Sequence, residues 1–336
     1  MKVLITGAAG FLGQKLAKKI VSEGNVGGSA VTELILVDII AASLPVASSA
    51  IACRAITADF SKQDEVKAAL ESKPHCIFHL AAIVSGDAEK NFELGYTINV
   101  DGFKYLLDAI HADESYTPRL VLASSAAVFG APVPDSIPDT HHRTPRTSYG
   151  CQKAICELYL DDYSRKGFVD GVALRFPTIS IRPGKPNKAA SSFFSGIIRE
   201  PLAGIEAVCP VERSIRHPVT SPRKAVEFLL HAASLSADKL KDGRAITMPA
   251  LTVSVGEMID SLERIAGKEV TGLIKMEKDD FIQSIIGNWH FCFDTKRAEA
   301  LGFEGNKTFD EIVQIHIDDE LGGAVHIAKK QNTDVC

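Results

Sequence analysis

Residues 2–13 read KVLITGAAGFLG, an apolar run that passes through three glycines into an apolar-periodic segment. The run predicts a buried strand, and the segment that continues to Gly24 predicts the helix behind it. Glycines also mark ordinary tight turns, but a GxxGxxG turn between a strand and a helix is where a dinucleotide pyrophosphate binds. The residues predicted to form this cofactor turn are Gly7, Gly10, Phe11, Leu12 and Gly13.

Short β-branched runs alternate with helical patterns through the first 184 residues. This alternation predicts a Rossmann-type fold, a doubly wound parallel sheet covered by helices. Further strands are expected at 33–39, 54–60, 76–82, 119–130, 171–184 and 244–249. Further helices are expected at 61–73 with Ser61 as N-cap, at 99–112, 147–167, 221–235, 253–267 and 307–324, with a loop and short helix at 185–202. We expect a cofactor domain over 1–180, to which 217–250 returns, and a smaller substrate-binding lobe over 181–336.

The composition excludes several classes of protein. A net charge of −5 over 336 residues offers no basic surface for nucleic acid or an anionic membrane. No stretch approaches the ~20 apolar residues that span a bilayer, and the first apolar run is too short for a signal peptide. The seven cysteines are scattered and form no CxxC pair. We therefore expect a cytoplasmic protein without disulfides and with no nucleic-acid or membrane partner.

Asp38 lies at the end of the second predicted strand, ELILVDI. A carboxylate at this position accepts the ribose hydroxyls of NAD and repels the 2′-phosphate of NADP. The following residues, Ile39 and Ile40, supply no arginine for such a phosphate. A solvated aspartate at a strand end is the simpler alternative, but the pattern favours NAD.

Two further strand ends carry candidate cofactor contacts. Asp59 and Phe60 could bind and flank the adenine ring, although Asp59 could instead cap the helix that follows. Small residues after the fourth strand would let the backbone approach the cofactor, although packing explains them equally well. These residues are Leu80, Ala81 and Ala82.

Ser125, Tyr149 and Lys153 carry the predicted chemistry. Tyr149 and Lys153 are four residues apart and share one helix face, where the ammonium favours the phenolate. By spacing alone a surface pair would be the better reading. Ser125 changes that balance, because it ends a strand at the carboxyl edge of the sheet, where ligands bind. A proton acceptor beside a nicotinamide predicts hydride transfer at a carbon that bears oxygen.

The order of these motifs resembles the extended short-chain dehydrogenases/reductases over essentially the whole chain. The motifs are TGAAGFLG, Asp38, Asp59-Phe60, HLAA, Asn99 in NVDG, SSAAVFG and YGCQK. The resemblance implies that Ser125 orients the reacting oxygen, Tyr149 accepts the proton, and Lys153 tunes Tyr149 and holds the nicotinamide ribose. It also implies that Asn99 belongs to the proton-relay and cofactor region and Pro177 to the nicotinamide side. In this family the helices expected at 99–112 and 147–167 often form a homodimer bundle.

Residues 176–208 and 214–226 resemble the branch of this family that oxidises D-erythronate, a four-carbon sugar acid, at C2 to the 2-keto acid. A nucleotide-sugar epimerase or dehydratase is the alternative. Those enzymes usually carry Thr where this chain has Ala127 and Tyr where it has Phe129, and no acidic residue adjoins Ser125. A non-catalytic NAD-sensing protein is a third possibility, but such proteins tend to lose the Tyr or the Lys.

A sugar acid requires a cation for its carboxylate, and a guanidinium binds one in bidentate fashion. Arg182 and Arg216 both lie in the segments just described, and we favour Arg216; Arg182 could instead pair structurally at a strand end. Candidate hydroxyl contacts are Ser85, Thr178 and Asn187. The adjacent His141 and His142 point apart in extended chain and lack a third ligand, so we expect no metal.

Overall fold

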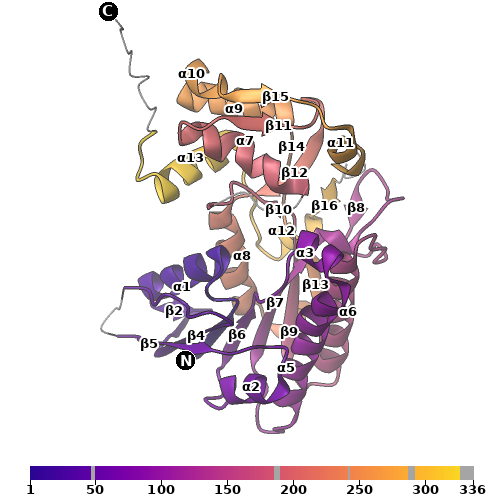
Figure 1. Ribbon diagram of the computed structural model, residues 1–336. Helices are drawn as coiled ribbons and strands as arrows, with labels where there is room; N and C mark the ends of the chain where they lie inside the picture. Colours follow the sequence, from indigo (N-terminus) through magenta and orange to yellow (C-terminus); the bar gives the residue numbers. More distant parts are fainter. Residues whose placement is uncertain (47–49, 185–189, 241–242, 287–291, 326–336) are drawn as a thin grey trace, which may run out of the picture. The chain divides into compact units, whose positions relative to one another are not determined.

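The computed structural model describes residues 1–46, 50–184, 190–240, 243–286 and 292–325 (Figure 1). The chain divides into two compact units, which are described separately. The first unit comprises Met1–Pro177, Pro222–Pro249 and Cys292–Gly305. The second comprises the described parts of Thr178–Ser221, Ala250–Phe291 and Asn306–Cys336.

A seven-stranded sheet forms the centre of the first unit, in the order β13-β9-β7-β6-β1-β4-β5. Every strand pairing in it is parallel, which confirms the predicted fold class. The strand order reverses beside β1, and in open α/β sheets the ligand binds at the carboxyl ends of the strands at such a point. The strands are β1 (Lys2–Thr6), β4 (Glu33–Asp38), β5 (Ala52–Thr57), β6 (Cys76–His79), β7 (Arg119–Ser125), β9 (Asp170–Phe176) and β13 (Ala245–Thr247).

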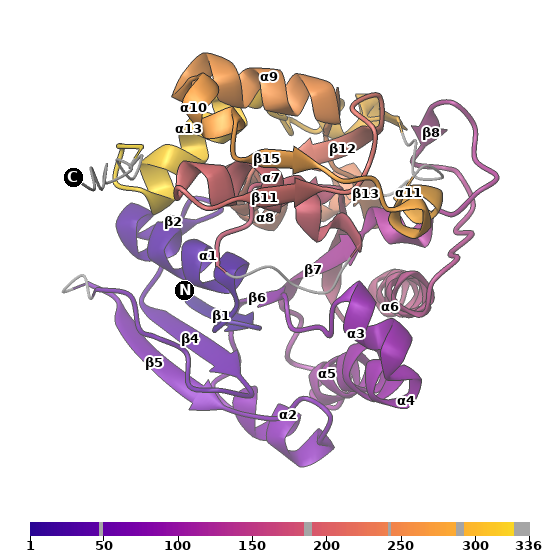
Figure 2. The ribbon, with the colours of Figure 1, turned by 45° about the horizontal axis from the view of Figure 1, so that its top comes forward.

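Helices cover both faces of this sheet. Figures 1 and 2 show α1 and α8 on one face and α2, α5 and α6 on the other. The helices are α1 (Phe11–Glu23), α2 (Gln63–Ala69), α3 (Ser85–Lys90), α4 (Phe92–Tyr96), the π-helix η1 (Thr97–Asp101), α5 (Gly102–His111), the 3₁₀ helices η2 (Ala126–Val128) and η4 (Ala237–Leu240), α6 (Ser148–Arg165), α8 (Pro222–Ser234) and α12 (Lys296–Ala300). Two short strand pairs complete the unit, β2 (Asn25–Val26) with β3 (Ser29–Ala30) and β8 (Ile137–Pro138) with β16 (Phe293–Asp294). Leu4, Phe103 and Leu160 are fully buried in one of its hydrophobic clusters.

The second unit contains a three-stranded and a two-stranded sheet. The strands are β10 (Thr178–Ile179), β12 (Arg216–Thr220) and β14 (Leu251–Ser254), and β11 (Ala207–Cys209) with β15 (Ile274–Met276). The helices are η3 (Ala190–Ser192), α7 (Phe193–Leu202), α9 (Val255–Ala266), α10 (Lys268–Thr271), α11 (Asp280–Ile286) and α13 (Phe309–Glu320). Phe194, Met258 and Ile312 lie in its core. In either unit, the described residues include no helix of the length and apolarity that crossing a membrane requires.

Several predicted boundaries are wrong at the carboxyl ends of strands. The strand expected at 119–130 ends at Ser125, and η2 follows it. The strand expected at 171–184 is two strands, β9 and β10, separated by Pro177, which lacks the N–H that a ladder needs. Residues 54–60 were expected as a strand, but β5 runs from Ala52 to Thr57.

Two helix starts also differ from the prediction. Ser61 was expected as an N-cap, but α2 begins at Gln63, and Lys62 at the N-cap position makes no side-chain cap. The helix expected from Asn99 begins at Phe92 and continues through η1 into α5. A π-helical turn adds one residue per turn and is frequent at functional sites. Asn99 therefore lies in the middle of a helical run and is not an N-cap.

Candidate functional site

The glycine turn connects β1 to α1 and leaves no room for side chains. Gly7 has φ +69°, and a Cβ on it would lie 2.6 Å from the backbone nitrogen of Ala81. A Cβ on Gly13 would lie 2.5 Å from the carbonyl oxygen of Gly7. Gly10 occupies the N-cap position of α1, and no side chain caps the helix there. A bare turn at a helix N-terminus fits a pyrophosphate, so this site fits a dinucleotide.

Asp38 is tied to the glycine turn. The last residue of β4, it accepts a hydrogen bond from the Ala9 N–H through Oδ2, at 2.9 Å. Its other oxygen, Oδ1, has a long contact of 3.4 Å with the Ile40 N–H. The carboxylate is thus held beside the turn, where its charge disfavours a second phosphate on a ribose.

Asp59 and Phe60 lie beyond the end of β5. Asp59 Oδ1 accepts hydrogen bonds from the backbone N–H and the hydroxyl of Ser61, which hold the pKa of Asp59 below its usual value. The Phe60 side chain is 7% exposed and packs in the core near His79. The contact of either residue with an adenine ring therefore stays a prediction.

The segment after β6 is fixed by two buried polar side chains. Thr6 Oγ1 hydrogen-bonds His79 Nδ1 at 2.9 Å and accepts the Ala81 N–H at 3.3 Å. Burial, with the charge of Lys153 as a second cause, lowers the pKa of His79 to about 3. His79 is therefore neutral at physiological pH. Leu80, Ala81 and Ala82 are half-buried beyond the strand end.

Asn99 is 3% exposed, and its side chain is fully engaged. Oδ1 accepts the Ile83 N–H at 2.8 Å, while Nδ2 donates to the Ile83 carbonyl at 3.0 Å and to Gln152 Oε1 at 2.7 Å. The π-helical turn thus presents Asn99 to the segment after β6 and to α6. Its visible role is to fix the backbone of Ile83.

The segments that carry Ser125 and Tyr149 pack directly against each other. Ser125 is the last residue of β7, and its Oγ accepts the Ala127 N–H at 3.1 Å. Thr147 caps α6 by accepting the Gly150 N–H, which places Tyr149 in the first turn. A Cβ on Gly150 would lie 2.1 Å from the Ala127 carbonyl oxygen. The absence of a side chain at Gly150 therefore allows α6 to begin against the residues that follow Ser125.

Lys153 lies one turn further along α6 and is only 3% exposed. Its Nζ donates to the Ala123 carbonyl at 2.8 Å and lies 5.7 Å from the centre of the Tyr149 ring. The structure thus places Lys153 beside Tyr149 and against the end of β7, two residues from Ser125, an arrangement that could support general-base chemistry.

The predicted substrate residues have different environments. Arg216 is exposed, and its guanidinium already contacts Glu257 Oε2 at 3.3 Å and the Thr252 carbonyl at 2.9 Å. Arg182 is half-buried, and burial together with the neighbouring Arg199 lowers its pKa. Thr178 Oγ1 hydrogen-bonds the buried His217 at 2.6 Å. Asn187 lies outside the described residues.

Ser85 and Pro177 belong to the first unit. Ser85 is the first residue of the short helix α3 and is half-buried. Pro177 is buried immediately after β9. The six cysteines within the described ranges are all free.

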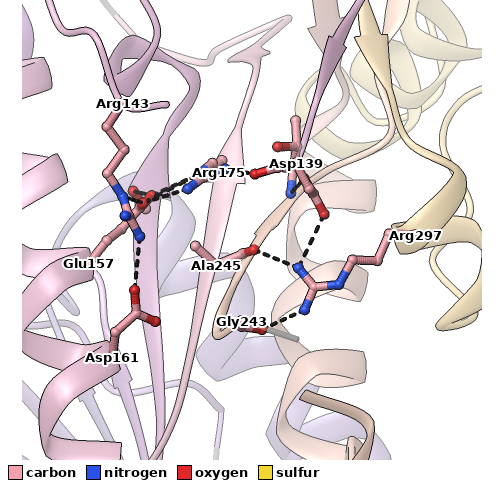
Figure 3. Close-up of polar contacts among 10 residues, drawn as sticks. Asp139, Arg143, Glu157, Asp161, Arg175, Gly243, Ala245 and Arg297 are labelled. Atoms are coloured by element: carbon pink, nitrogen blue, oxygen red, sulfur yellow. Dashed lines mark hydrogen bonds and ion pairs between the residues drawn. The ribbon is translucent and has the colours of Figure 1, made fainter. Parts of the chain in front are cut away.

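The sequence reasoning missed Glu157, which is fully buried on α6. It is surrounded by Ser124, Arg143 and Arg175, as Figure 3 shows for the two arginines. The four-residue spacing of Tyr149, Lys153 and Glu157 places all three on one face of the helix, and this spacing could have indicated that Glu157 lies near the site.

Known proteins share both the sequence and the fold. The NAD dependent epimerase/dehydratase family matches residues 3–213. D-erythronate dehydrogenase from Cupriavidus necator is 42% identical over 95% of this chain and 98% of its own length. The enzyme of that name from Haemophilus influenzae is 40% identical over 96% of this chain and 100% of its own.

Among solved structures, one described as a nucleoside-diphosphate-sugar epimerase from Agrobacterium tumefaciens has a TM-score of 0.92 and 50% identity, over 97% of this chain and 96% of that one. A holo L-threonine dehydrogenase from Cupriavidus necator has a TM-score of 0.79 at 19% identity, over 95% of this chain and 99% of its own, which indicates a shared fold. The chain therefore belongs to the NAD-dependent epimerase/dehydratase family of extended short-chain dehydrogenases/reductases and is an NAD-dependent oxidoreductase.

Proposed function

We propose that this protein oxidises D-erythronate at C2 to 2-dehydro-D-erythronate. The observation that carries the proposal is Tyr149 beside the buried Lys153, in a helix that begins against the residues following Ser125. The substrate is supported by two relatives named for D-erythronate oxidation, each about as long as this chain.

Each residue of the set has one role. Tyr149, as the phenolate, accepts the proton of the C2 hydroxyl and later passes it to solvent. Ser125 donates a hydrogen bond to the same oxygen and orients it. Lys153 stabilises the phenolate by its charge. NAD, when bound, would supply the hydride acceptor, and the hydride would carry two electrons and one proton away from C2. Gly7, Gly10, Phe11, Leu12, Gly13 and Asp38 would hold its pyrophosphate and adenosine ribose.

The substrate carboxylate requires a cation, and Arg182 and Arg216 are the two candidates to bind it. The Arg216 guanidinium contacts Glu257 and the Thr252 carbonyl, and a bound carboxylate would share it with these groups. Arg182 is half-buried near Arg199, and an anion at that position would offset both positive charges. Thr178, Ser85 and Asn187 remain candidates for the hydroxyl groups.

A nucleotide-sugar epimerase is the second candidate, because a structure described in those terms is 50% identical to this chain. Ala127 and Phe129 argue against it, since epimerases of this family usually carry Thr and Tyr there. Such an enzyme keeps its cofactor bound and produces no net NADH.

Steady-state NADH formation distinguishes the two candidates. The purified protein is incubated with NAD and, separately, D-erythronate, its stereoisomers, and UDP- or dTDP-sugars. The proposal predicts NADH formation with D-erythronate and none with the nucleotide sugars. Conversion of a nucleotide sugar to its epimer without NADH would establish the alternative instead.

We further propose a cytoplasmic homodimer. Free cysteines suit a reducing compartment. Leu158 on α6 is 55% exposed, and Phe92 on α4 is 59% exposed, so apolar side chains remain on the helices expected to form a bundle. Light scattering after size-exclusion chromatography should give twice the chain mass, and Leu158→Glu should reduce it to one chain. A monomer at all concentrations would refute the dimer.

A further inference from the structure

Glu157 is fully buried on α6 and accepts hydrogen bonds from three side chains. Oε1 accepts the Ser124 hydroxyl at 2.6 Å and the Arg175 Nε at 3.0 Å. Oε2 accepts from Arg175 Nη2 at 2.8 Å and from Arg143 Nε at 2.6 Å. Burial raises the pKa of Glu157, but the hydrogen bonds and charge of Arg175, together with the hydrogen bonds from Ser124 and Arg143, hold the pKa below its usual value.

Such a buried charge is tolerated only when it is paired and hydrogen-bonded. Arg175 is 3% exposed, and its guanidinium also lies over the Phe129 ring and donates to the Asp139 carbonyl at 3.1 Å. Figure 3 shows these contacts, with the Glu157 carboxylate bound to the guanidinium groups of both Arg143 and Arg175. The carboxylate therefore joins α6, β7, β9 and the loop before α6 at one point.

The elements it joins are those that carry the reacting groups. Tyr149, Lys153 and Glu157 follow at four-residue spacing on α6, so they share one face. Ser124 directly precedes Ser125 on β7, and successive strand side chains point to opposite faces. The hydrogen bond to Glu157 holds the Ser124 side chain on the α6 face of the sheet. The orientation of the neighbouring Ser125 side chain, on the other face, is then determined as well.

We propose that Glu157 is a positioning residue, which through Ser124 and Arg175 sets the position of Ser125 relative to Tyr149 and Lys153. It does not contact the reacting atoms. The inference rests on the proposed function for its kinetic consequences, but the geometric consequence can be measured without turnover.

The test compares Ser124→Ala, Glu157→Gln and a matched control, Ser164→Ala. Ser164 is also a buried serine, on the same helix, and accepts the Gly171 N–H at 3.2 Å, far along α6 from Tyr149. Each serine variant loses one buried hydrogen bond, so both should lower Tm by a similar amount. Ser124→Ala keeps the pairing of Glu157 with both arginines and is expected to fold even if Glu157→Gln does not.

We expect Ser124→Ala to lower kcat with D-erythronate about tenfold and Glu157→Gln by more, because small misplacements of reacting groups are costly. Their Kd for NAD should stay within about twofold of the wild-type value, and Ser164→Ala should keep kcat within about twofold. Equal kcat in the two serine variants would overturn the proposal and leave Glu157 a purely structural ion pair.

Crystal structures of the wild type, Ser124→Ala and Ser164→Ala, each with NAD bound, provide the second measurement. The distance between the Ser125 and Tyr149 hydroxyl oxygens should change in Ser124→Ala only. A wild-type protein that oxidises no sugar acid would refute the proposed function alone. The crystal structures would then decide the positioning role, and an unchanged distance in Ser124→Ala would refute it.

Discussion

Lys153 donates a hydrogen bond of 2.8 Å from its Nζ to the backbone carbonyl of Ala123, two residues before Ser125. The ammonium thus connects α6 to β7 at the sheet edge and also lies 5.7 Å from the Tyr149 ring. One side chain therefore connects two elements and also places a positive charge beside the Tyr149 ring.

Replacing Lys153 by Met should therefore affect both properties. We expect kcat/KM to fall by about a hundredfold or more, because charge stabilisation and proton transfer each contribute on that scale. The loss of the tether should also lower Tm. Lys166→Met, at the exposed end of the same helix, is the control and should leave both unchanged. A Lys153→Met enzyme with wild-type kcat/KM would be incompatible with the assigned role.

Gly7→Ala should abolish cofactor binding through backbone crowding. Gly7 and Gly24 have similar angles, φ +69° and +72°, but a Cβ on Gly24 meets nothing within 4 Å. Gly24→Ala should cost only the backbone strain, about 1 kcal/mol, whereas Gly7→Ala should cost roughly 2 kcal/mol more. Calorimetric titration with NAD should show binding in Gly24→Ala and none in Gly7→Ala. Equal affinity in both variants would contradict the glycine-turn assignment.

Asp38→Asn isolates the charge at the adenosine ribose. The amide oxygen can still accept the Ala9 N–H, so the glycine turn should remain intact. We expect the ratio of NAD to NADP affinity to fall about tenfold or more, since repulsion of the 2′-phosphate is removed. Kd values for both cofactors measure this, and an unchanged ratio would show that Asp38 does not select NAD.

His79 should make folding stability depend on pH. Its folded pKa of about 3 lies below the ordinary value of 6.5, so below pH 6.5 the unfolded chain binds a proton that the folded protein does not. Stability should thus be highest above pH 6.5 and fall as the pH drops toward 3, by about 2 kcal/mol at pH 5. Denaturant unfolding at several pH values gives the free energy of unfolding of the wild type, His79→Asn and the exposed His142→Gln. Only His79→Asn should reduce the slope of this free energy against pH. An unchanged slope in that variant would show that His79 is not the group responsible.

The parallel sheet and the site at its edge could be predicted because their signals are local. Apolar runs, the glycine spacing and the Tyr149 to Lys153 interval each reflect one element's geometry. The β2–β3 hairpin within NVGGSA is a further local feature, and its Gly27 and Gly28 both have positive φ. A Gly-Gly pair between short runs is a known hairpin signal, so this pair could have been predicted.

Features that depend on partners distant in sequence could not be predicted. The contact of Arg216 with Glu257, for example, arises only when β12 pairs with β14. Burial of Glu157 depends on Arg175, which lies 18 residues away on another element. Charged residues on a helix are usually solvated, so the sequence of α6 alone does not indicate that Glu157 is buried.

Replacing Tyr149 by Phe tests the central claim most directly. The measurement is NADH formation from D-erythronate by the wild type, Tyr149→Phe and Tyr159→Phe, with the Kd for NAD determined on each protein. Tyr159 is a second phenol on the same helix and controls for the loss of a hydroxyl. We predict that Tyr149→Phe binds NAD normally and loses turnover by about a thousandfold or more, while Tyr159→Phe remains active. Turnover by Tyr149→Phe within about tenfold of the wild type would show that another group accepts the proton.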